Sequence, residues 1–352
     1  VVDLVVEDGD LRNAAIAFAE KIADQRPVPR ISQMNEKVTN VDPAIFDAMR
    51  KKIERRARNQ IAPYHCIACV EAAVSLPFEE GVARERELFQ EIVNGDEAKS
   101  LRYAFFSERE ATKIPDIDKS ISAVDVRLAA VVGAGTMGGG IAMCFADSGI
   151  PVKLLEISQK FLDTGMAKIK ANYETSIKRG SLTAEGMAER LALIDPVISY
   201  DDIANADMVI EAVFEEMPVK KEVFAKLDAV MKEGAIMASN TSTLDIDEIA
   251  SATKRPEAVL GMHFFSPANV MKLLEIVRGE NSSKEAVATA LKVARRIGKV
   301  GAVCGNCDGF LANRSRMPFQ TEMNILIEDG ALPEQVDKVM VDFGYPVGPF
   351  VV

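Results

Sequence analysis

Histidine and cysteine, two residues often used for metal binding and redox chemistry, are scarce in this sequence. The 352 residues include two histidines and five cysteines. Four cysteines form Cys-x-x-Cys pairs, Cys66 with Cys69 and Cys304 with Cys307, which is the ligand number of a structural zinc site. About 235 residues separate the pairs, however, and Cys66 and Cys69 lie on one face of an expected helix. We therefore expect no metal, and buried packing thiols in a reducing cytosol.

Positive charge is also in deficit. The 42 Lys and Arg residues against 53 Asp and Glu give a formal net charge of −11, which argues against nucleic acid or an anionic membrane surface as the main partner. We find no signal peptide, transit segment, internal repeat or low-complexity tract. The chain opens on Val1-Val2-Asp3-Leu4 and closes on Gly348-Pro349-Phe350, so we expect both ends to be interior positions of a longer protein.

One stretch organises the rest of the chain. The apolar run 128–132 enters the turn Gly133-Ala134-Gly135-Thr136-Met137-Gly138, a helical segment follows, and a second apolar run ends at Glu156. In this pattern the three glycines permit a tight turn, backbone approach to a pyrophosphate, and close helix–strand packing, with the helix N-terminus facing the phosphates. A carboxylate about twenty residues further on binds the ribose hydroxyls of NAD and repels the extra phosphate of NADP. The stretch therefore predicts an NAD site.

The same stretch has an alternative interpretation as a membrane span. Residues 128–146 carry no charge and are numerous enough to cross a bilayer. Five glycines, Thr136 and the spacing of the fingerprint argue against a span, so we predict a soluble nucleotide-binding fold with no membrane span.

The remaining sequence separates into a helical part and an α/β part. Up to about residue 95 the pattern is helical, and a helix starting at Asp42-Pro43 carries a basic run from Arg50 to Arg58. That run either meets ligand phosphates or forms a solvated helix face, as charge runs usually do. From Arg127 strands and helices alternate, which is typical of a doubly wound, Rossmann-type sheet. The expected strands are 128–132, 152–156, 197–200, 207–213, 235–239, 258–264, 272–277 and 299–303; the expected helices are 11–24, 78–93, 96–110, 158–179, 183–193, 218–233, 283–297, 309–329 and 333–343.

Polar groups follow three of these strands, at the edge where ligands collect in such sheets. They include Glu215 with Lys220, the hydroxyl-rich segment 239–243, and His263. Histidine suits removal of a hydroxyl proton while hydride leaves for a nicotinamide, because it titrates near neutrality. Glu275, twelve residues further on, would orient the ring. Spacing alone equally allows a core histidine that donates to a backbone carbonyl.

Four motifs resemble one known family. The glycine turn, Ser239-Asn240-Thr241-Ser242, the segment from His263-Phe264-Phe265-Ser266-Pro267 to Glu275, and Asp308-Gly309-Phe310-Leu311-Ala312-Asn313-Arg314 are similar to 3-hydroxyacyl-CoA dehydrogenases, over about residues 127–350. The resemblance implies that His263 is the base and Glu275 its partner. It implies that Ser242 and Asn313 bind substrate. It implies an NAD site formed by Gly133, Gly135, Thr136, Met137, Gly138, Glu156, Glu215, Lys220, Ser242 and Ser266, with Ser266 standing where related enzymes commonly have asparagine.

The N-terminal part carries a second resemblance. Val1-Val2-Asp3-Leu4-Val5-Val6 and the following helix look like the tail of a crotonase-type enoyl-CoA hydratase domain, and segment 98–108 is similar to multifunctional β-oxidation enzymes. The hydratase core would lie upstream, so we expect no hydratase activity. The implied organisation is a crotonase remnant at 1–112, a linker at 113–126, the NAD-binding Rossmann domain at 127–306, and the start of an all-α C-terminal domain at 307–352.

The expected activity is NAD-dependent oxidation of (S)-3-hydroxyacyl-CoA to 3-oxoacyl-CoA in fatty-acid β-oxidation. Two alternatives stay open: a Rossmann dehydrogenase of β-hydroxy acids without CoA, and a fragment that binds NAD without turnover. The expected partners are acyl-CoA and either a second copy in a homodimer or other β-oxidation enzymes, with no nucleic acid. The expected compartment is the bacterial cytoplasm, or the peroxisome if the source is eukaryotic.

Overall fold

The computed structural model describes residues 3–118 and 120–351 and divides them into two compact units. The N-terminal unit comprises the described residues up to Tyr103 together with Val339–Pro346, and the sheet unit comprises Ala104–Lys338 with the residues after Pro346. Val1 and Val2, which contribute to the second resemblance, lie outside the described residues. All candidate site residues fall in the sheet unit.

The N-terminal unit is helical, as predicted. Its elements are α1 (Leu11–Ile22), the short η1 (Ile31–Gln33), α2 (Ala44–Ile53), α3 (Ala62–Ser75) and α4 (Phe78–Val93), and α5 (Asp96–Glu110) continues into the sheet unit. The Asp42 carboxylate accepts a hydrogen bond from the backbone N–H of Ala44 and so begins α2, as its sequence predicts.

The helix expected to carry the whole basic run is shorter than predicted. α2 ends at Ile53, and turns follow it to Asn59, whose φ of 58° lies in the left-handed region that interrupts a helix. Lys51, Lys52, Arg55 and Arg56 are all exposed. The run is therefore split between the end of one helix and the turns after it. Most of its side chains face solvent, whereas Arg50 is partly buried and ion-paired with Asp47 and Glu71.

The sheet unit is built on eight strands in the order β3-β2-β1-β4-β5-β6-β7-β8. The first six strands are parallel where they pair, and β7 pairs antiparallel with β6 and parallel with β8. Only eight residues connect β6 to β7, too few for the crossover that a parallel pair needs. The strand bounds are β1 Ala129–Val132, β2 Val152–Leu155, β3 Ile194–Val197, β4 Met208–Glu211, β5 Ile236–Ser239, β6 Val259–Phe264, β7 Leu273–Arg278 and β8 Val300–Gly305.

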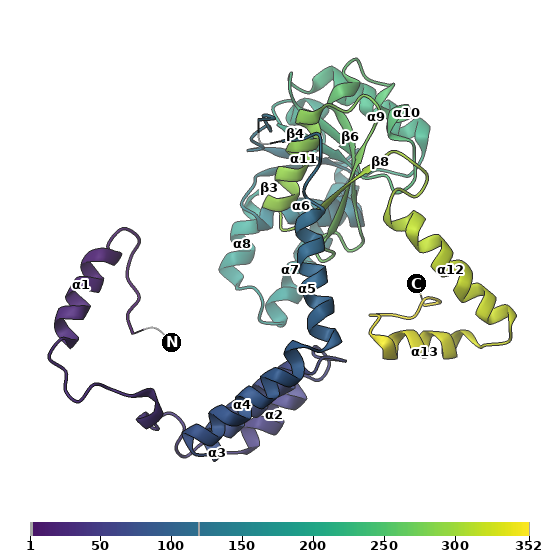
Figure 1. The fold of residues 1–352 in the computed structure, drawn as a ribbon. Helices are drawn as coiled ribbons and strands as arrows, with labels where there is room; N and C mark the ends of the chain where they lie inside the picture. Colours follow the sequence, from purple (N-terminus) through teal and green to yellow (C-terminus); the bar gives the residue numbers. More distant parts are fainter. Residues whose placement is uncertain (1–2, 119, 352) are drawn as a thin grey trace. The chain divides into compact units, whose positions relative to one another are not determined.

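Helices cover both faces of the sheet, and alternate residues of a strand enter opposite cores (Figure 1). Ala129 and Val131 of β1 pack with α6 and α11, whereas Ala130 and Val132 pack with α9 and α10. Because both faces are buried, the strands read as continuous apolar runs. The helices of this unit are α6 Thr136–Asp147, α7 Gln159–Lys178, α8 Ala184–Ala192, α9 Met217–Val230, α10 Ile246–Ala250, α11 Lys284–Arg296, α12 Ala312–Glu328 and most of α13 Pro333–Phe343, with short helices η2 Tyr200–Ile203 and η3 Pro256–Ala258.

One predicted strand was misplaced. The strand expected at 197–200 lies at Ile194–Val197, where Pro196 is tolerated because β3 is the edge strand of the sheet. Of the residues assigned to the strand, Val197 ends β3 and Tyr200 already belongs to η2, which begins where the Ser199 hydroxyl accepts a hydrogen bond from the backbone N–H of Asp201. Helix α10 was not predicted, since its five residues are too few to show a helical period.

The structure tests two further expectations, one about a membrane span and one about the burial of the cysteines. Within the described residues no helix has the length and apolar character needed to cross a bilayer, and the uncharged stretch 128–146 forms β1, the glycine turn and α6. The expectation of buried thiols was wrong for Cys66 and Cys307, which are exposed, and holds for Cys144, which is buried. Burial raises the pKa of the Cys144 thiol to about 11.

Candidate active site

The turn between β1 and α6 is shaped by backbone rather than side chains. Gly133 has a φ of 100°, a conformation that residues with a Cβ rarely adopt. A Cβ on Gly138 would lie 1.8 Å from the carbonyl oxygen of Gly133, so no side chain fits there. A Cβ on Gly135 would meet nothing within 4 Å, which leaves this point of the turn open. The first N–H groups of α6, which begins at Thr136, have no acceptors within the helix and suit a phosphate.

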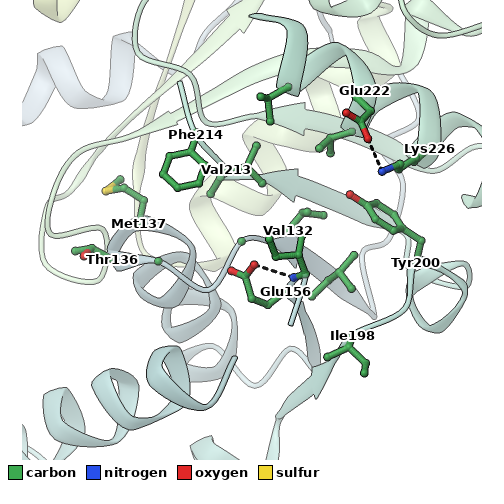
Figure 2. A pocket seen from close by; sticks show the side chains of 17 residues that line it. Val132, Thr136, Met137, Glu156, Ile198, Tyr200, Val213, Phe214, Glu222 and Lys226 are labelled. Carbon is green, nitrogen blue, oxygen red and sulfur yellow. Dashed lines mark hydrogen bonds and ion pairs between the residues drawn. The ribbon is translucent and has the colours of Figure 1, made fainter. Parts of the chain in front are cut away.

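A cavity of about 520 Å³ lies beside this turn. Figure 2 shows Glu156 between Thr136 and Met137 on one side and Tyr200 on the other. Of the residues that the sequence predicts to bind NAD, those lining the cavity are Gly133, Gly135, Thr136, Met137 and Glu156. Gly138 lies behind the turn, fully buried, where its lack of a side chain allows the helix to approach the strand.

Glu156 lies over the turn at the end of β2. Its Oε2 accepts a hydrogen bond from the backbone N–H of Ala134 at 2.8 Å, and its Oε1 accepts one from Ile157 at 2.7 Å. Both bonds orient a half-exposed carboxylate at the cavity wall. That arrangement favours ribose hydroxyls and repels a phosphate in the same place.

Three polar residues on the opposite wall were missed by sequence reasoning. Lys226 on α9 is ion-paired with Glu222 at 2.7 Å, and its ammonium lies 5.7 Å from the ring centroid of Tyr200 in η2. Figure 2 shows this group across the cavity from the turn. The segments that carry these residues follow β3 and β4. Because ligands bind at the carboxyl ends of the strands in such sheets, their place in the sequence could have identified them. Tyr200 was not identified in this way because the strand was predicted at 197–200, which includes it.

His263 and Glu275 lie opposite one another on the antiparallel strands β6 and β7. Nδ1 of His263 is 2.7 Å from Oε2 of Glu275, and the two residues are 6% and 0% exposed. The ring nitrogen therefore contacts a carboxylate, not the backbone carbonyl of the core-histidine alternative. No described residue hydrogen-bonds Nε2. This geometry leaves Nε2 available to take a proton while Nδ1 stays held.

The Glu275 carboxylate is held from two sides. Its second oxygen accepts hydrogen bonds from the backbone N–H groups of Leu311, at 3.0 Å, and Ala312, at 2.7 Å, where α12 begins. Burial opposes its ionisation, but the His263 hydrogen bond and these two N–H donors outweigh that effect and lower its pKa. The aromatic rings of Phe265 and Phe310 pack against His263, with centroids 4.4 and 5.9 Å away.

Ser242 lies in the loop after β5 and is fixed by Glu215. Oε1 of Glu215 accepts hydrogen bonds from the Ser242 N–H at 2.7 Å, the Ser242 hydroxyl at 3.1 Å and the Thr241 hydroxyl at 2.6 Å. Burial raises the pKa of Glu215, but these bonds and the charge of Lys220 outweigh it, so the pKa lies below its usual value. The Asn313 amide donates to the Ser242 carbonyl oxygen at 3.4 Å, which brings the two predicted substrate residues together.

The other predicted cofactor residues do not line the cavity. Lys220 is 1% exposed and ion-paired with Glu211 and Glu215, at 2.7 and 3.2 Å. Ser266 is exposed in the loop after β6 and its side chain hydrogen-bonds no described residue. Asn240 belongs to the motif 239–242 but had no role assigned to it. Its Oδ1 accepts a hydrogen bond at 2.8 Å from the N–H of Phe264 and so ties the end of β5 to the residue after His263.

Comparisons with known proteins point to one family. Residues 128–307 match the domain described as "3-hydroxyacyl-CoA dehydrogenase, NAD binding domain", and residues 309–352 match the corresponding C-terminal domain. A peroxisomal bifunctional enzyme from Cavia porcellus is 41% identical over 358 residues, covering 99% of this chain and 49% of the relative. The chain thus spans about half the length of the curated relatives it matches.

Solved structures agree with this match. The (S)-3-hydroxybutyryl-CoA dehydrogenase PaaH1 from Ralstonia eutropha is 36% identical, with a TM-score of 0.61 over 64% of this chain and 80% of that one. A 3-hydroxybutyryl-CoA dehydrogenase from Escherichia coli K12 is 39% identical, with a TM-score of 0.61 over 64% of this chain and 48% of that one. The family resemblance, the Rossmann-type fold with flanking helical parts, and NAD as cofactor are confirmed.

Proposed function

Because the chain belongs to the 3-hydroxyacyl-CoA dehydrogenase family, we propose that it oxidises (S)-3-hydroxyacyl-CoA to 3-oxoacyl-CoA with NAD, as a step of fatty-acid β-oxidation. The observation that carries this proposal is the His263–Glu275 contact of 2.7 Å at the sheet edge. A base with one free ring nitrogen, buried among aromatic rings, suits removal of the proton from a secondary alcohol.

In the proposed mechanism His263 Nε2 accepts the proton of the substrate hydroxyl. The imidazolium that forms keeps its Nδ1–H directed at Glu275, whose negative charge stabilises it. The N–H groups of Leu311 and Ala312 hold Glu275 in place, so the dyad does not reorganise as charge develops. Ser242 and Asn313 supply hydrogen bonds that orient the substrate oxygen.

The turn and cavity fit the proposed cofactor site. The backbone at Gly135 is open to a ligand, and the missing side chain at Gly138 lets α6 lie close to the turn. Together with the Glu156 carboxylate, this surface matches a pyrophosphate followed by a ribose. Gly133, Gly135, Thr136, Met137 and Glu156 would hold the adenosine half of NAD, and bound NAD supplies the acceptor for the hydride that leaves the substrate carbon. Ser242 would lie near the nicotinamide.

The experiment that tests this function measures NADH formation by this chain from (S)-3-hydroxybutyryl-CoA and from free 3-hydroxybutyrate, beside a titration of NAD binding. We expect turnover of the thioester at least about 100-fold above that of the free acid, because binding energy from the CoA portion raises kcat/KM. Equal turnover of both would favour a dehydrogenase of free β-hydroxy acids. NAD binding without turnover of either would favour a non-catalytic fragment.

We also propose the domain organisation that the motifs imply. Residues 1–112 correspond to the helical tail of a crotonase-type domain, 113–126 to a linker, 127–306 to the NAD-binding domain and 307–352 to the start of the C-terminal domain. The described residues between Glu110 and Ala129 belong to no helix or strand, which supports the linker. Limited proteolysis should cut first within 113–126, and a first cut inside the sheet would contradict this assignment.

Partners and compartment are proposals of the same kind. The exposed side chains of Met317, Ile325 and Leu326 on α12 support association with a second copy or with other β-oxidation enzymes. Light scattering at several concentrations should show a dimer.

The name of the Cavia porcellus relative supports a peroxisomal location for a eukaryotic source, and a bacterial source would place the chain in the cytoplasm. Fractionation of source cells tests this directly.

A further inference from the structure

The loop that joins β6 to β7 connects the two members of the His263–Glu275 pair. This β6–β7 loop comprises residues 265–272. It follows β6, which carries His263, and leads into β7, which carries Glu275. Its first residue, Phe265, packs its ring against that of His263, with centroids 4.4 Å apart. The position of the base therefore depends on where this loop lies.

The β6–β7 loop lies on α6, the helix that follows the glycine turn. Most of the loop is exposed, but Ala268 near its centre is 1% exposed. The Cys144 thiol of α6 donates a hydrogen bond to the Ala268 carbonyl oxygen, with 3.4 Å between sulfur and oxygen. A Cβ on Gly140, also in α6, would lie 3.0 Å from the Cβ of Ala268. The loop thus reaches α6 because Gly140 has no side chain.

Lys299, between α11 and β8, holds the same loop from another side. Its ammonium donates hydrogen bonds to the carbonyl oxygens of Ala268, at 2.5 Å, and Met271, at 2.6 Å. Its backbone N–H is fixed by the carbonyl oxygen of Ala294, at 2.8 Å. Lys299 is half-buried, and no carboxylate of residues 3–118 and 120–351 pairs with it. Its charge therefore acts on the loop backbone, where a charged donor bonds more strongly than a neutral one.

We propose that Lys299 and Gly140 are positioning residues, which seat the β6–β7 loop on α6 and so set the place of His263 relative to the cofactor. The substrate hydroxyl gives its proton to His263 while hydride leaves the carbon that bears it, so base and hydride acceptor must both be in reach of one substrate. Neither Lys299 nor Gly140 lines the cavity beside the glycine turn. This inference rests on the proposed function, in which His263 is the base and the turn binds NAD.

Two substitutions test the proposal from opposite sides of the loop. Lys299→Met removes the ammonium and keeps an unbranched stem, whereas Gly140→Ala places a methyl group against Ala268 while the lysine stays. In each variant kcat should fall at least about tenfold, the scale of a misplaced reacting group, while KM for NAD stays within about twofold. The isotope effect on kcat with substrate deuterated at C3 should rise above that of the parent, because a misaligned hydride transfer becomes the slow step.

A measurement without substrate or cofactor tests the seating of the loop itself. The backbone N–H groups of Val270 and Met271 both donate to the Pro267 carbonyl oxygen, at 2.9 and 3.0 Å, and close a turn within the loop. Hydrogen–deuterium exchange of peptides covering 265–272 should be at least about fivefold faster in both variants, since a released loop opens this turn more often. If the parent chain has no turnover, the proposed function fails, while exchange still tests the seating.

Matched controls lie beside both positions. Gly139→Ala adds the same methyl group to α6, but its nearest neighbour is the Ile169 side chain of α7, at 3.3 Å, and not the loop. Lys292→Met removes an ammonium whose side chain is 49% exposed and paired with Asp125. Both controls should change kcat and loop exchange by no more than about twofold.

Three results would overturn the proposal. Unchanged kcat and loop exchange in Lys299→Met and Gly140→Ala would show that the loop keeps its place without them. A raised KM for NAD with unchanged kcat would show that these residues shape the cofactor site instead. A fall in kcat of the same size in Gly139→Ala would show a general sensitivity of α6, with no special role for the contact at Gly140.

Discussion

The glycine turn and the His263–Glu275 hairpin are two halves of one site, built in different ways. The turn joins neighbouring elements, β1 and α6, and its shape depends on three residues that lack side chains. The hairpin half gathers side chains from the ends of β4, β5, β6 and β7 and from the start of α12, which are far apart in the sequence. A local backbone site is sensitive to added volume, whereas an assembled side-chain site is sensitive to lost hydrogen bonds and charges.

The largest expected effect falls on the hairpin half. Replacing His263 by Ala removes the base, and kcat should fall on the order of 100- to 10,000-fold. The affinity for NAD should stay the same, because the turn is untouched. Steady-state NADH formation and a fluorescence titration measure the two quantities, and near-parental turnover would show that another group is the base.

Two glycine substitutions separate the roles within the turn. Gly138→Ala places a methyl group against the Gly133 carbonyl, and should destabilise the fold by about 1–3 kcal/mol in urea denaturation. Gly135→Ala meets no protein atom, so it should leave stability within about 0.5 kcal/mol and weaken NAD binding instead. If both variants lost stability equally, the open approach at Gly135 would not be a ligand route.

A smaller effect is expected at the ribose position. Glu156→Ala should weaken NAD binding about tenfold, the worth of one hydrogen bond to a charged group. The exposed Glu174 on α7 offers a control, since Glu174→Ala changes the net charge equally at a distance from the cavity wall. Unchanged NAD affinity in the Glu156 variant would argue against the ribose contact.

The smallest effect concerns pH. The pKa of Glu275 is lower in the folded chain than its ordinary value of 4.5, so its contribution to stability is complete above that value and is lost as pH falls through the lowered pKa. Urea denaturation at a series of pH values below about 5 should therefore show a shallower loss of stability in Glu275→Gln than in the parent. Parallel curves would show that the carboxylate is not held in its ionised form by folding.

The difference between the halves also explains which parts were predictable. The turn, Glu156 and most strands follow from local patterns, because buried parallel strands read as apolar runs and glycine spacing reports backbone geometry. β3 was misplaced because Pro196 interrupts its pattern, and the N-terminal basic helix was extended past Ile53 because charge alone does not mark a helix end.

In the assembled half, the polar residues that follow the strands indicated His263, Glu215 and the segment 239–243, and the resemblance assigned their roles. The resemblance supplied His263, Glu275, Ser242 and Asn313, and the structure brings these residues into two adjoining clusters. Neither the strand ends nor the resemblance assigned a contact to Glu211 or Asn240. Their positions become meaningful only once β4, β5 and β6 lie side by side, since each acts by contacting a neighbouring strand or helix.

The most direct test of the central claim is a crystal structure of this chain with NADH and a 3-oxoacyl-CoA. We predict that Nε2 of His263 lies within about 2.6–3.2 Å of the 3-oxo oxygen, as a base in reach of the proton it removes must, while Nδ1 keeps its contact with Glu275. An Nε2 turned away from that oxygen, with another side chain in its place, would contradict the account.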